Sequence, residues 1–502
     1  MTKLFFIPLV LLISICPLFA QKTLLIRSVW VVDGSGASAF RGSVRVKDSL
    51  IIGVGNLQQQ TTDSVIDGSN LVLAPGFIDT HSHHFGDLDD HPESLATVSQ
   101  GITTIVSGQD GNGEPIDSIR GFLKRTPASV NVATYTGHTS LRERVMGADL
   151  LRPASVKEIN IMQGLLSQEM QKGSLGLSTG LEYEEAFYSS TDEVIQLAQT
   201  AAHFGGSYAS HIRSEDITLD SAIEEILHIG RLTKMPVQIS HIKIGLKDKW
   251  GTASIFLKRL DQARSEGIQA TADVYPYDFW SSTLRVLFPK RDYSNLASAK
   301  FAAEHLFDPD RSVLVRYAPN TSYVGNTITA VAQLQNQTTP QTLLKLVADA
   351  DQFKKSNPAY RYGIEAIAAK AMTEEDVTTF IKWPYANICS DGRAGGHPRG
   401  FGTFTKILRQ YVKEQSVLSL EQAIYKMTYL GAKNTGIKNR GLIKEGYYAD
   451  LVLFDQDTVA DQSTLEQPTA ISKGVVIVWV NGRVAFQKGQ CTAARPGVFI
   501  SK

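Results

Sequence analysis

Short apolar runs alternate with stretches of helical periodicity over most of the chain. Eight of these runs end in a polar residue that can bind a metal or take part in catalysis: residues 71–83, 102–110, 130–138, 175–182, 208–211, 237–243, 270–275 and 388–391. Apolar residues recur with a helical period in several of the intervening stretches, at 155–172, 191–203, 222–232 and 254–264. Strands that alternate with helices predict βαβ units and a parallel sheet.

The number of runs and their polar ends distinguish between two parallel folds. Eight strands, each with a polar residue where it stops, favour a (β/α)8 TIM barrel, because the site of such a barrel lies on the loops at the carboxyl ends of its strands. The alternative is an open, doubly wound sheet, which would gather its polar groups at one switch point. We therefore predict an α/β barrel over residues 71–435.

The two ends of the chain have a different pattern from the middle. Residues 21–70 and 436–502 are rich in Val and Ile and contain several short strand-like runs separated by turn signals. The pair Asn481-Gly482 is a strong hairpin signal between two such runs. Because each end is too small to fold alone, we expect the two to pair into one small β-sandwich beside the barrel.

A long stretch separates the seventh and eighth predicted barrel strands. Residues 278–385 exceed an ordinary βα connection and predict an insertion over the catalytic face, with helical segments at 297–307, 341–350 and 373–382. Such insertions usually shape substrate specificity. A peripheral subdomain with a role in assembly is the alternative.

The first twenty residues have the pattern of a secretory signal. Lys3 precedes an apolar stretch over residues 4–20, after which an ordinary soluble sequence begins. We expect a cleaved signal peptide at residues 1–20 and export to a periplasm or to the medium. An uncleaved anchor and lipidation at Cys16 are the alternatives.

The charge balance limits the kinds of molecule that the protein is expected to bind, and the cysteine content argues against a disulfide framework. The chain carries 50 Lys and Arg against 50 Asp and Glu, and no basic patch or RNA-binding aromatic motif is evident. We expect a small-molecule substrate, no nucleic acid and, after signal cleavage, no membrane; a homo-oligomer is possible. Outside the signal stretch the cysteines are Cys389 and Cys491, and without a spaced framework we expect them to be free.

Histidines and one aspartate predict a metal centre at the strand ends. His81 and His83 lie two residues apart, so a strand would aim both imidazoles at one cation. His211 and His241 end two further runs and would hold a second cation. Each histidine alone has a structural alternative, but four at strand ends favour ligands. Asp110 would supply the anionic ligand between the two ions.

Asp391 is the candidate general base and acid. After the eighth strand it would take a proton from the attacking water and deliver it to a leaving amine, and metal coordination is compatible with that role. The alternative is an ordinary turn aspartate, since Ser390-Asp391-Gly392 is common turn chemistry.

An ordered series of motifs gives the chain a family resemblance. The segments are PGFIDTHSH at 75–83, GITTIV at 101–106, GHTSLR at 137–142, GLSTGLEY at 176–183, SHIR at 210–213, SHIK at 240–243, DVYPY at 273–277, SDG at 390–392 and HPR at 397–399. Over nearly its whole length the chain resembles the N-acyl-D-amino-acid deacylases (D-aminoacylases) of the amidohydrolase superfamily. The resemblance implies Zn²⁺, as one or two divalent ions. The better-known members carry a cysteine where this chain has Asp110.

An N-acyl amino acid also needs an anchor for its free α-carboxylate. Lys243 would lie on the same strand face as His241 and is the first candidate. The resemblance adds Tyr275, Arg285 and Arg399, with Arg285 aligned only loosely because it lies in the insertion. His138 and Glu182 are expected near the site, to contact substrate or to orient its ligands; the full set of predicted substrate residues is Lys243, Tyr275, Arg285, Arg399, His138 and Glu182.

The leading hypothesis is a metal-dependent hydrolase that releases a carboxylate and a free amino acid from N-acyl-D-amino acids or D-amino-acid-containing dipeptides. The D stereochemistry is implied by the resemblance alone. Alternatives within the superfamily are a cyclic amidohydrolase of the dihydroorotase or hydantoinase kind and an L-specific dipeptidase. The cyclic enzymes often use a carboxylated lysine on the fourth strand, and residues 175–179 contain none. A non-catalytic metal-binding or ligand-binding protein is the alternative of another class.

Overall fold

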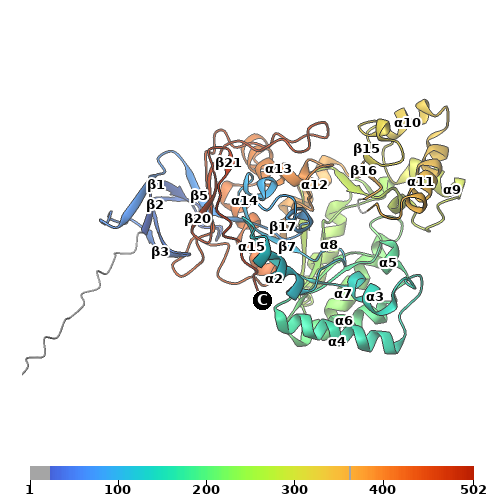
Figure 1. The fold of residues 1–502 in the computed structure, drawn as a ribbon, viewed down its shortest axis with the longest axis horizontal. Coiled ribbons are helices and arrows are strands. Elements are labelled where there is room, and N and C mark those ends of the chain that lie inside the picture. The colour runs from blue at the N-terminus through green and yellow to red at the C-terminus, as the bar shows by residue number, and fades with distance from the viewer. Residues whose placement is uncertain (1–22, 361–362) are drawn as a thin grey trace, which may run out of the picture.

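A computed structural model of the chain describes residues 23–360 and 363–502. The predicted signal peptide at residues 1–20, with Cys16, lies outside the described residues. A β-sheet built from the chain ends lies on one side of a central barrel, and a subdomain carrying α9, α10 and α11 lies on the other (Figure 1). In the two described ranges, no helix is both long enough and apolar enough to cross a bilayer.

Eight parallel strands form the central barrel. They are β6 (Phe77–Asp79), β7 (Ile102–Ser107), β8 (Asn131–Thr134) continued by β9 (Thr136–Gly137), β10 (Gly176–Gly180), β11 (Ser207–His211), β12 (Val237–Ile239), β13 (Ala270–Val274) and β17 (Ala386–Ile388). The first and last strands meet where the Asp391 N–H donates to the His81 carbonyl at 2.8 Å. On the other side of the barrel, β8 meets β10 where the Leu175 N–H donates to the Thr134 carbonyl at 2.9 Å. The barrel is therefore closed, as the strand-end pattern predicts, and an open sheet is excluded.

Helices surround the barrel, and the longer ones bury apolar side chains in the core that they share with the strands. They are α1 (Leu95–Val98), α2 (Ile116–Arg125), α3 (His138–Met146), α4 (Val156–Lys172), α5 (Glu184–Phe187), α6 (Thr191–His203), α7 (Leu219–Thr233), α8 (Ala253–Ser265), α12 (Glu374–Lys382), α13 (Arg399–Lys406), α14 (Leu420–Met427) and α15 (Tyr429–Thr435), with a π-helix at Ile407–Glu414. The barrel strands are almost wholly buried, as expected of parallel strands covered on both faces.

Local sequence signals mark the ends of the barrel helices, as α4 illustrates. Ser155 accepts a hydrogen bond from the Glu158 N–H, and the Glu158 side chain bonds back to the Ser155 N–H. At the other end, Gly173 has a φ of 107°, a left-handed conformation that glycine adopts without a Cβ clash. These signals fix α4 within one residue of the predicted stretch.

The two chain ends pair into one nine-stranded sheet. Its strands follow the order β21 (Gln490–Cys491), β20 (Arg483–Gln487), β19 (Val475–Val480), β18 (Leu451–Phe454), β5 (Val72–Pro75), β1 (Thr23–Val31), β2 (Phe40–Lys47) and β3 (Leu50–Gly55), with β4 (Asp63–Asp67) beside β1. Asn481 and Gly482 make the predicted hairpin turn, with φ values of 48° and 75°. Buried residues from both ends share one core, which includes Val44 and Trp479.

The boundaries of the end sheet differ from the prediction in two places. The apolar run at 71–83 is not one strand: it divides at Gly76 into β5 of the end sheet and β6 of the barrel. A Cβ on Gly76 would lie 2.3 Å from the Thr103 side chain, so only glycine fits at this division. The last residues also leave the sheet. Val498 accepts a hydrogen bond from the N–H of Val132 on β8, which places the tail against the barrel.

The insertion is a subdomain with its own sheet and core. It contains β14 (Phe279–Ser282), β16 (Glu365–Lys370) and β15 (Val313–Tyr317), antiparallel in that order, with α9 (Leu296–His305), α10 (Ile328–Leu334) and α11 (Thr339–Ser356). A separate apolar cluster fills it. The insertion is shorter than the predicted 278–385, because α12 belongs to the barrel. Phe380 of α12 stacks edge-on against Phe256 of α8, with ring centroids 5.7 Å apart.

Candidate metal centre and active site

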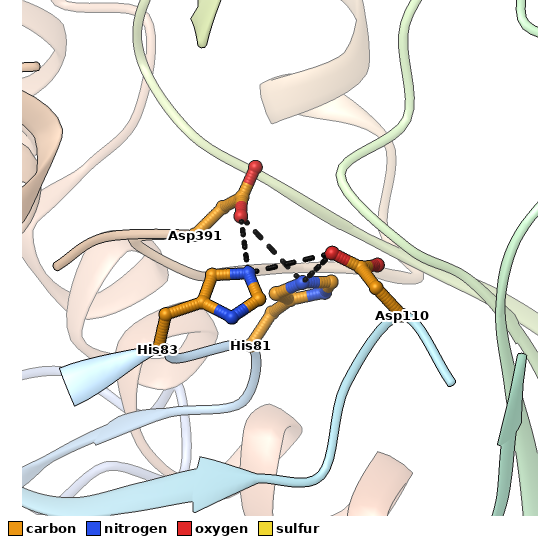
Figure 2. A group of neighbouring side chains, drawn as sticks. All are labelled: His81, His83, Asp110 and Asp391. Carbon is orange, nitrogen blue, oxygen red and sulfur yellow. Dashed lines mark hydrogen bonds and ion pairs between the residues drawn. The ribbon is translucent and has the colours of Figure 1, made fainter. Parts of the chain in front are cut away.

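Four predicted ligands meet at the carboxyl end of the barrel (Figure 2). His81 and His83 follow β6, Asp110 follows β7 and Asp391 follows β17. Their ligand atoms all lie within 4.8 Å of one another. His83 Nε2 is 3.1 Å from Asp391 Oδ1 and 3.4 Å from Asp110 Oδ2, and His81 Nε2 is also 3.4 Å from Asp110 Oδ2. Figure 2 shows both imidazoles and both carboxylates pointing to one centre.

A second group continues from the first through Asp110. His211 ends β11 and His241 follows β12. His241 Nε2 is 3.3 Å from Asp110 Oδ1 and 3.1 Å from His211 Nδ1. The two oxygens of Asp110 therefore face different histidine pairs, so Asp110 could supply a ligand atom to each of two cations.

The backbone is strained at three of these positions. Asp110, His241 and Asp391 have φ values of 55°, 36° and 47°, in the left-handed region that residues with a Cβ seldom adopt. Strain of this kind costs about 1–3 kcal/mol per residue and tends to gather at functional sites. These three side chains therefore reach the site only because their backbone adopts an unfavourable conformation.

The donor set fits a divalent metal such as Zn²⁺. Both ring nitrogens of His81 are buried and make no hydrogen bond with any described residue, which leaves a buried polar group that a metal would satisfy. Burial opposes protonation of His83, yet its hydrogen bonds with Asp110 and Asp391 raise its pKa to about 9. The carboxylates around His83 therefore stabilise positive charge at this place, and a bound metal cation would provide that charge. Imidazole nitrogen and carboxylate oxygen are ordinary zinc ligands.

Asp391 is held as a carboxylate by a buried arginine. Burial alone would raise its pKa, but the charges of Arg399 and His241 and a hydrogen bond with His83 outweigh burial and hold the pKa well below its usual range. Arg399 Nη1 lies 2.8 Å from Asp391 Oδ2. Asp391 is therefore ionised at neutral pH, the state in which a carboxylate can accept a proton.

Two glutamates lie behind the second histidine pair, on the side away from Asp110. Glu182 Oε2 is 2.8 Å from His211 Nε2, and Glu215 Oε1 is 3.2 Å from His241 Nδ1. A carboxylate in this place fixes the ring orientation and leaves the other ring nitrogen for a metal. Sequence reasoning missed Glu215, because it lies in the loop four residues past His211. An acidic residue shortly after a strand-end histidine is the signal that could have found it.

The predicted substrate residues that follow strands β12 and β13 lie beside the metal centre. Lys243 is buried, and its Nζ is 2.7 Å from Glu215 Oε1, so it already has a carboxylate partner. Two cations lie near the Tyr275 ring: its centroid is 5.9 Å from Lys243 Nζ and 5.0 Å from the Arg399 guanidinium carbon. The Tyr275 hydroxyl is buried without a hydrogen-bond partner among the described residues.

Arg285 and His138 have other partners than expected. Arg285 forms ion pairs with Asp351 and Glu184 at the edge of the site, because it lies in a short 3-10 helix of the insertion, Leu284–Leu287. His138 begins α3 and is fully buried, and its Nε2 is 2.9 Å from Glu193 Oε1. It lines neither of the two cavities described below, and its contact with Glu193 joins α3 to α6, so support of the site is the role that its contacts favour.

Two cavities open at the metal centre, and Asp391 and Arg399 line both. The smaller, of about 50 Å³, is lined by His211, His241 and Lys243. The larger, of about 470 Å³, lies between the barrel loops and the insertion and includes His83 and Asp110 in its wall. Asp391 is therefore accessible from both cavities, the smaller of which also reaches His211 and His241 and the larger His83 and Asp110.

Comparison with known proteins agrees with this geometry. A profile of the amidohydrolase family matches residues 386–486. The N-acyl-D-aspartate deacylase of Alcaligenes xylosoxydans xylosoxydans is 34% identical, over 96% of this chain and 95% of that protein. The chain belongs to the N-acyl-D-amino-acid deacylase family.

Solved structures of this deacylase family share the fold. A D-aminoacylase structure has a TM-score of 0.83 and 30% identity, covering 95% of this chain and 99% of that one. The N-acyl-D-glutamate deacylase of Bordetella bronchiseptica has a TM-score of 0.84 and 29% identity, with the same coverage; it was solved with zinc and a phosphonate that mimics the tetrahedral intermediate. The (β/α)8 barrel with an additional β domain, and a metal-dependent amide hydrolase, are therefore confirmed.

Proposed function

We propose that this protein hydrolyses the amide bond of N-acyl-D-amino acids or of D-amino-acid-containing dipeptides, releasing a carboxylate and a free amino acid. One observation carries the proposal: Asp110 lies between two histidine pairs, with Asp391 beside them, at the mouth of a cavity. Relatives named for the deacylation of N-acyl-D-amino acids cover nearly the whole chain and support the D stereochemistry.

Different side chains bind the metal, transfer the proton and keep the proton acceptor ionised. Zn²⁺, when bound by the two histidine pairs and Asp110, supplies Lewis-acid chemistry that acidifies water and polarises a carbonyl. Asp391 accepts a proton from the attacking water and delivers it to the nitrogen of the leaving amine. Arg399 keeps Asp391 ionised before the reaction.

The amino-acid part of the substrate has an anchor in the smaller cavity. Lys243 and Arg399 place two cations in its wall, and both lie near the ring of Tyr275, whose buried hydroxyl has no hydrogen-bond partner among the described residues. A substrate α-carboxylate in this place gains charge-assisted hydrogen bonds. The scissile carbonyl then lies near Asp391, which lines both cavities.

A cyclic amidohydrolase is the weaker candidate. Strand β10 (Gly176–Gly180) carries no lysine that could be carboxylated to hold two ions, and Asp110, which faces both histidine pairs, would supply the shared anionic ligand instead. A linear amide is therefore the preferred substrate.

A stereochemical activity screen tests the proposal. The zinc-loaded protein is assayed with paired N-acetyl-D- and N-acetyl-L-amino acids, D-containing dipeptides and a hydantoin. Release of the D-amino acid alone supports the proposal. Hydrolysis confined to L-compounds overturns the stereochemistry, and hydrolysis confined to the hydantoin overturns the linear substrate.

We also propose that the protein is exported, to a periplasm or to the medium, and that it can form a homo-oligomer. The charged and apolar pattern at residues 3–20 supports export. Mass spectrometry of the protein from its native cells tests cleavage near residue 20, and light scattering of the purified protein gives its oligomeric state. An intact N-terminus in a cytoplasmic fraction would overturn export.

A further inference from the structure

Asp79 is a buried acidic residue that the mechanism above does not use. It is the last residue of β6 and is fully buried. Both of its oxygens bond to Ser390: Oδ1 accepts the Ser390 N–H at 2.7 Å, and Oδ2 accepts the Ser390 hydroxyl at 2.5 Å. In the part of the chain that the structure describes, no Lys, Arg or His nitrogen lies within 4.0 Å of this carboxyl group. The bonds to Ser390 are therefore its main compensation for burial.

Ser390 extends this network across Asp391. Its Oγ accepts the Gly392 N–H at 2.9 Å, while the Gly392 carbonyl accepts the His83 N–H at 2.9 Å. The Asp391 N–H donates to the His81 carbonyl at 2.8 Å. The turn that carries Asp391 is therefore fixed on both sides of the carboxylate.

The backbone of Asp391 needs such support. Its φ of 47° is in the left-handed region, which a residue with a Cβ keeps only where the surrounding contacts impose it. The carboxylate faces two groups at once, since Oδ1 lies 3.1 Å from His83 Nε2 and Oδ2 lies 2.8 Å from Arg399 Nη1. If the turn relaxed to a common conformation, the side chain would leave the backbone in another direction and this arrangement would be lost.

A second buried aspartate has the same relation to His241. The φ of His241 is 36°, and its N–H donates to Asp273 Oδ1 at 2.5 Å. Asp273 is fully buried and comes from β13, which pairs with the strand before His241; the segments that follow β6 and β17 likewise lie side by side. Two strained positions of the site are thus each held by a buried carboxyl group from the adjacent strand.

We propose that Asp79 is a positioning residue for catalysis: through Ser390 it imposes the left-handed backbone of Asp391 and so directs that carboxylate for proton transfer. This inference rests on the proposed function, which gives Asp391 the proton-transfer role. Asp79 lines neither of the two cavities at the metal centre, so it acts without touching substrate. Its loss should therefore lower kcat and leave KM nearly unchanged.

Two variants remove the contact from opposite sides. In Asp79→Asn the amide has one oxygen and cannot accept both hydrogen bonds from Ser390, and in Ser390→Ala the hydroxyl is absent. With zinc-loaded protein and N-acetyl-D-glutamate, we expect kcat to fall about 10–100-fold in each variant, KM to stay within about threefold and bound zinc to equal that of the parent. Because both variants break one interaction, the double variant should be no slower than the slower single variant.

The control is Asp376→Asn. Asp376 is also buried and accepts the N–H groups of Gly251 and Ala253 at the start of α8, but it lines neither cavity. We expect this variant to unfold at a lower urea concentration and to keep kcat within about twofold of the parent value. A kcat that is also retained in Asp79→Asn and Ser390→Ala, or that falls only in proportion to lost zinc, would refute the proposal. So would effects that multiply in the double variant.

Crystal structures of zinc-loaded parent and Asp79→Asn give a readout that does not depend on activity. We expect Asp391 Oδ1 to move away from His83 Nε2 in the variant, and an unmoved carboxylate would refute the proposal. If Asp79→Asn does not fold, Ser390→Ala serves in its place. If the parent hydrolyses no N-acyl-D-amino acid, the proposed function fails by itself, while the position of Asp391 in these structures still decides whether Asp79 directs it.

Discussion

At the scale of the residue, the account depends on a few side chains whose positions the barrel imposes. His81, His83, His211 and His241 were predictable because strand ends of a barrel meet at one face. Their partners were not. That Glu215 holds both His241 and Lys243 depends on the path of a loop, which carries no periodic signal in the sequence.

Asp391→Asn tests the proton-transfer role. An amide cannot accept the proton from the attacking water, so we expect kcat to fall by at least about 10²-fold, within the range for loss of general acid–base catalysis. Zinc should stay bound, since His81, His83 and Asp110 remain. Steady-state kinetics and metal analysis measure the two effects. Asp349→Asn on α11 is the control, and a kcat within a few-fold of the parent value in Asp391→Asn would contradict the role.

Glu215→Gln tests the support of the second histidine pair. The amide has no charge to hold the Nδ1 proton of His241, so we expect zinc affinity at the second site to fall by about 10–100-fold, the usual effect of losing such a partner. Competition with a chelator, followed by metal analysis, gives the affinity of each ion. Glu185→Gln is the control, because Glu185 lines the larger cavity and contacts no histidine. Unchanged affinity of both ions would show that Glu215 has no such role.

At the scale of the element, signals with a local cause were predicted well. The Asn481-Gly482 hairpin and the capped ends of α4 follow from backbone preferences of a few neighbouring residues. The division of the run at 71–83 was not predicted, because it depends on a contact of Gly76 with Thr103 that is distant in sequence. The assignment of α12 to the barrel likewise depends on packing against α8.

A buried network joins α3 to α6 and gives a pH prediction. Glu193 accepts hydrogen bonds from Arg142 and from His138, and although burial alone would raise its pKa, these contacts lower it from 4.5 to about 2. A lowered pKa stabilises the fold above pH 4.5, and that stability is lost as the pH falls from about 4.5 to about 2.

In Glu193→Gln we therefore expect the free energy of unfolding to fall less steeply as the pH is lowered below 4.5. We also expect a loss of about 3–5 kcal/mol at pH 7, because Arg142 is left buried without its charge partner. Urea unfolding between pH 3 and 7 measures both, with Glu375→Gln, an exposed residue of α12, as the control. The same acid dependence in Glu193→Gln as in the parent would contradict this assignment.

At the scale of the whole molecule, both the barrel and the insertion contribute residues to the site. The barrel supplies the histidines and Asp391, and the insertion supplies Arg285 and Arg316 to the same cavity. The sequence predicted an insertion over the catalytic face, but the order of its strands, β14, β16 and β15, follows from pairing between distant segments. The charge pattern of the cavity could not be derived without that order.

The most direct test of the central claim is a zinc titration of the metal-free protein, with activity and bound zinc measured together. The substrate is N-acetyl-D-glutamate, with its L-enantiomer as the control. We predict no hydrolysis without metal, and hydrolysis of the D-compound alone that appears as the His81, His83 and Asp110 site fills, because water is too weak a nucleophile without a bound cation. Equal hydrolysis by metal-free and zinc-loaded protein would contradict the account.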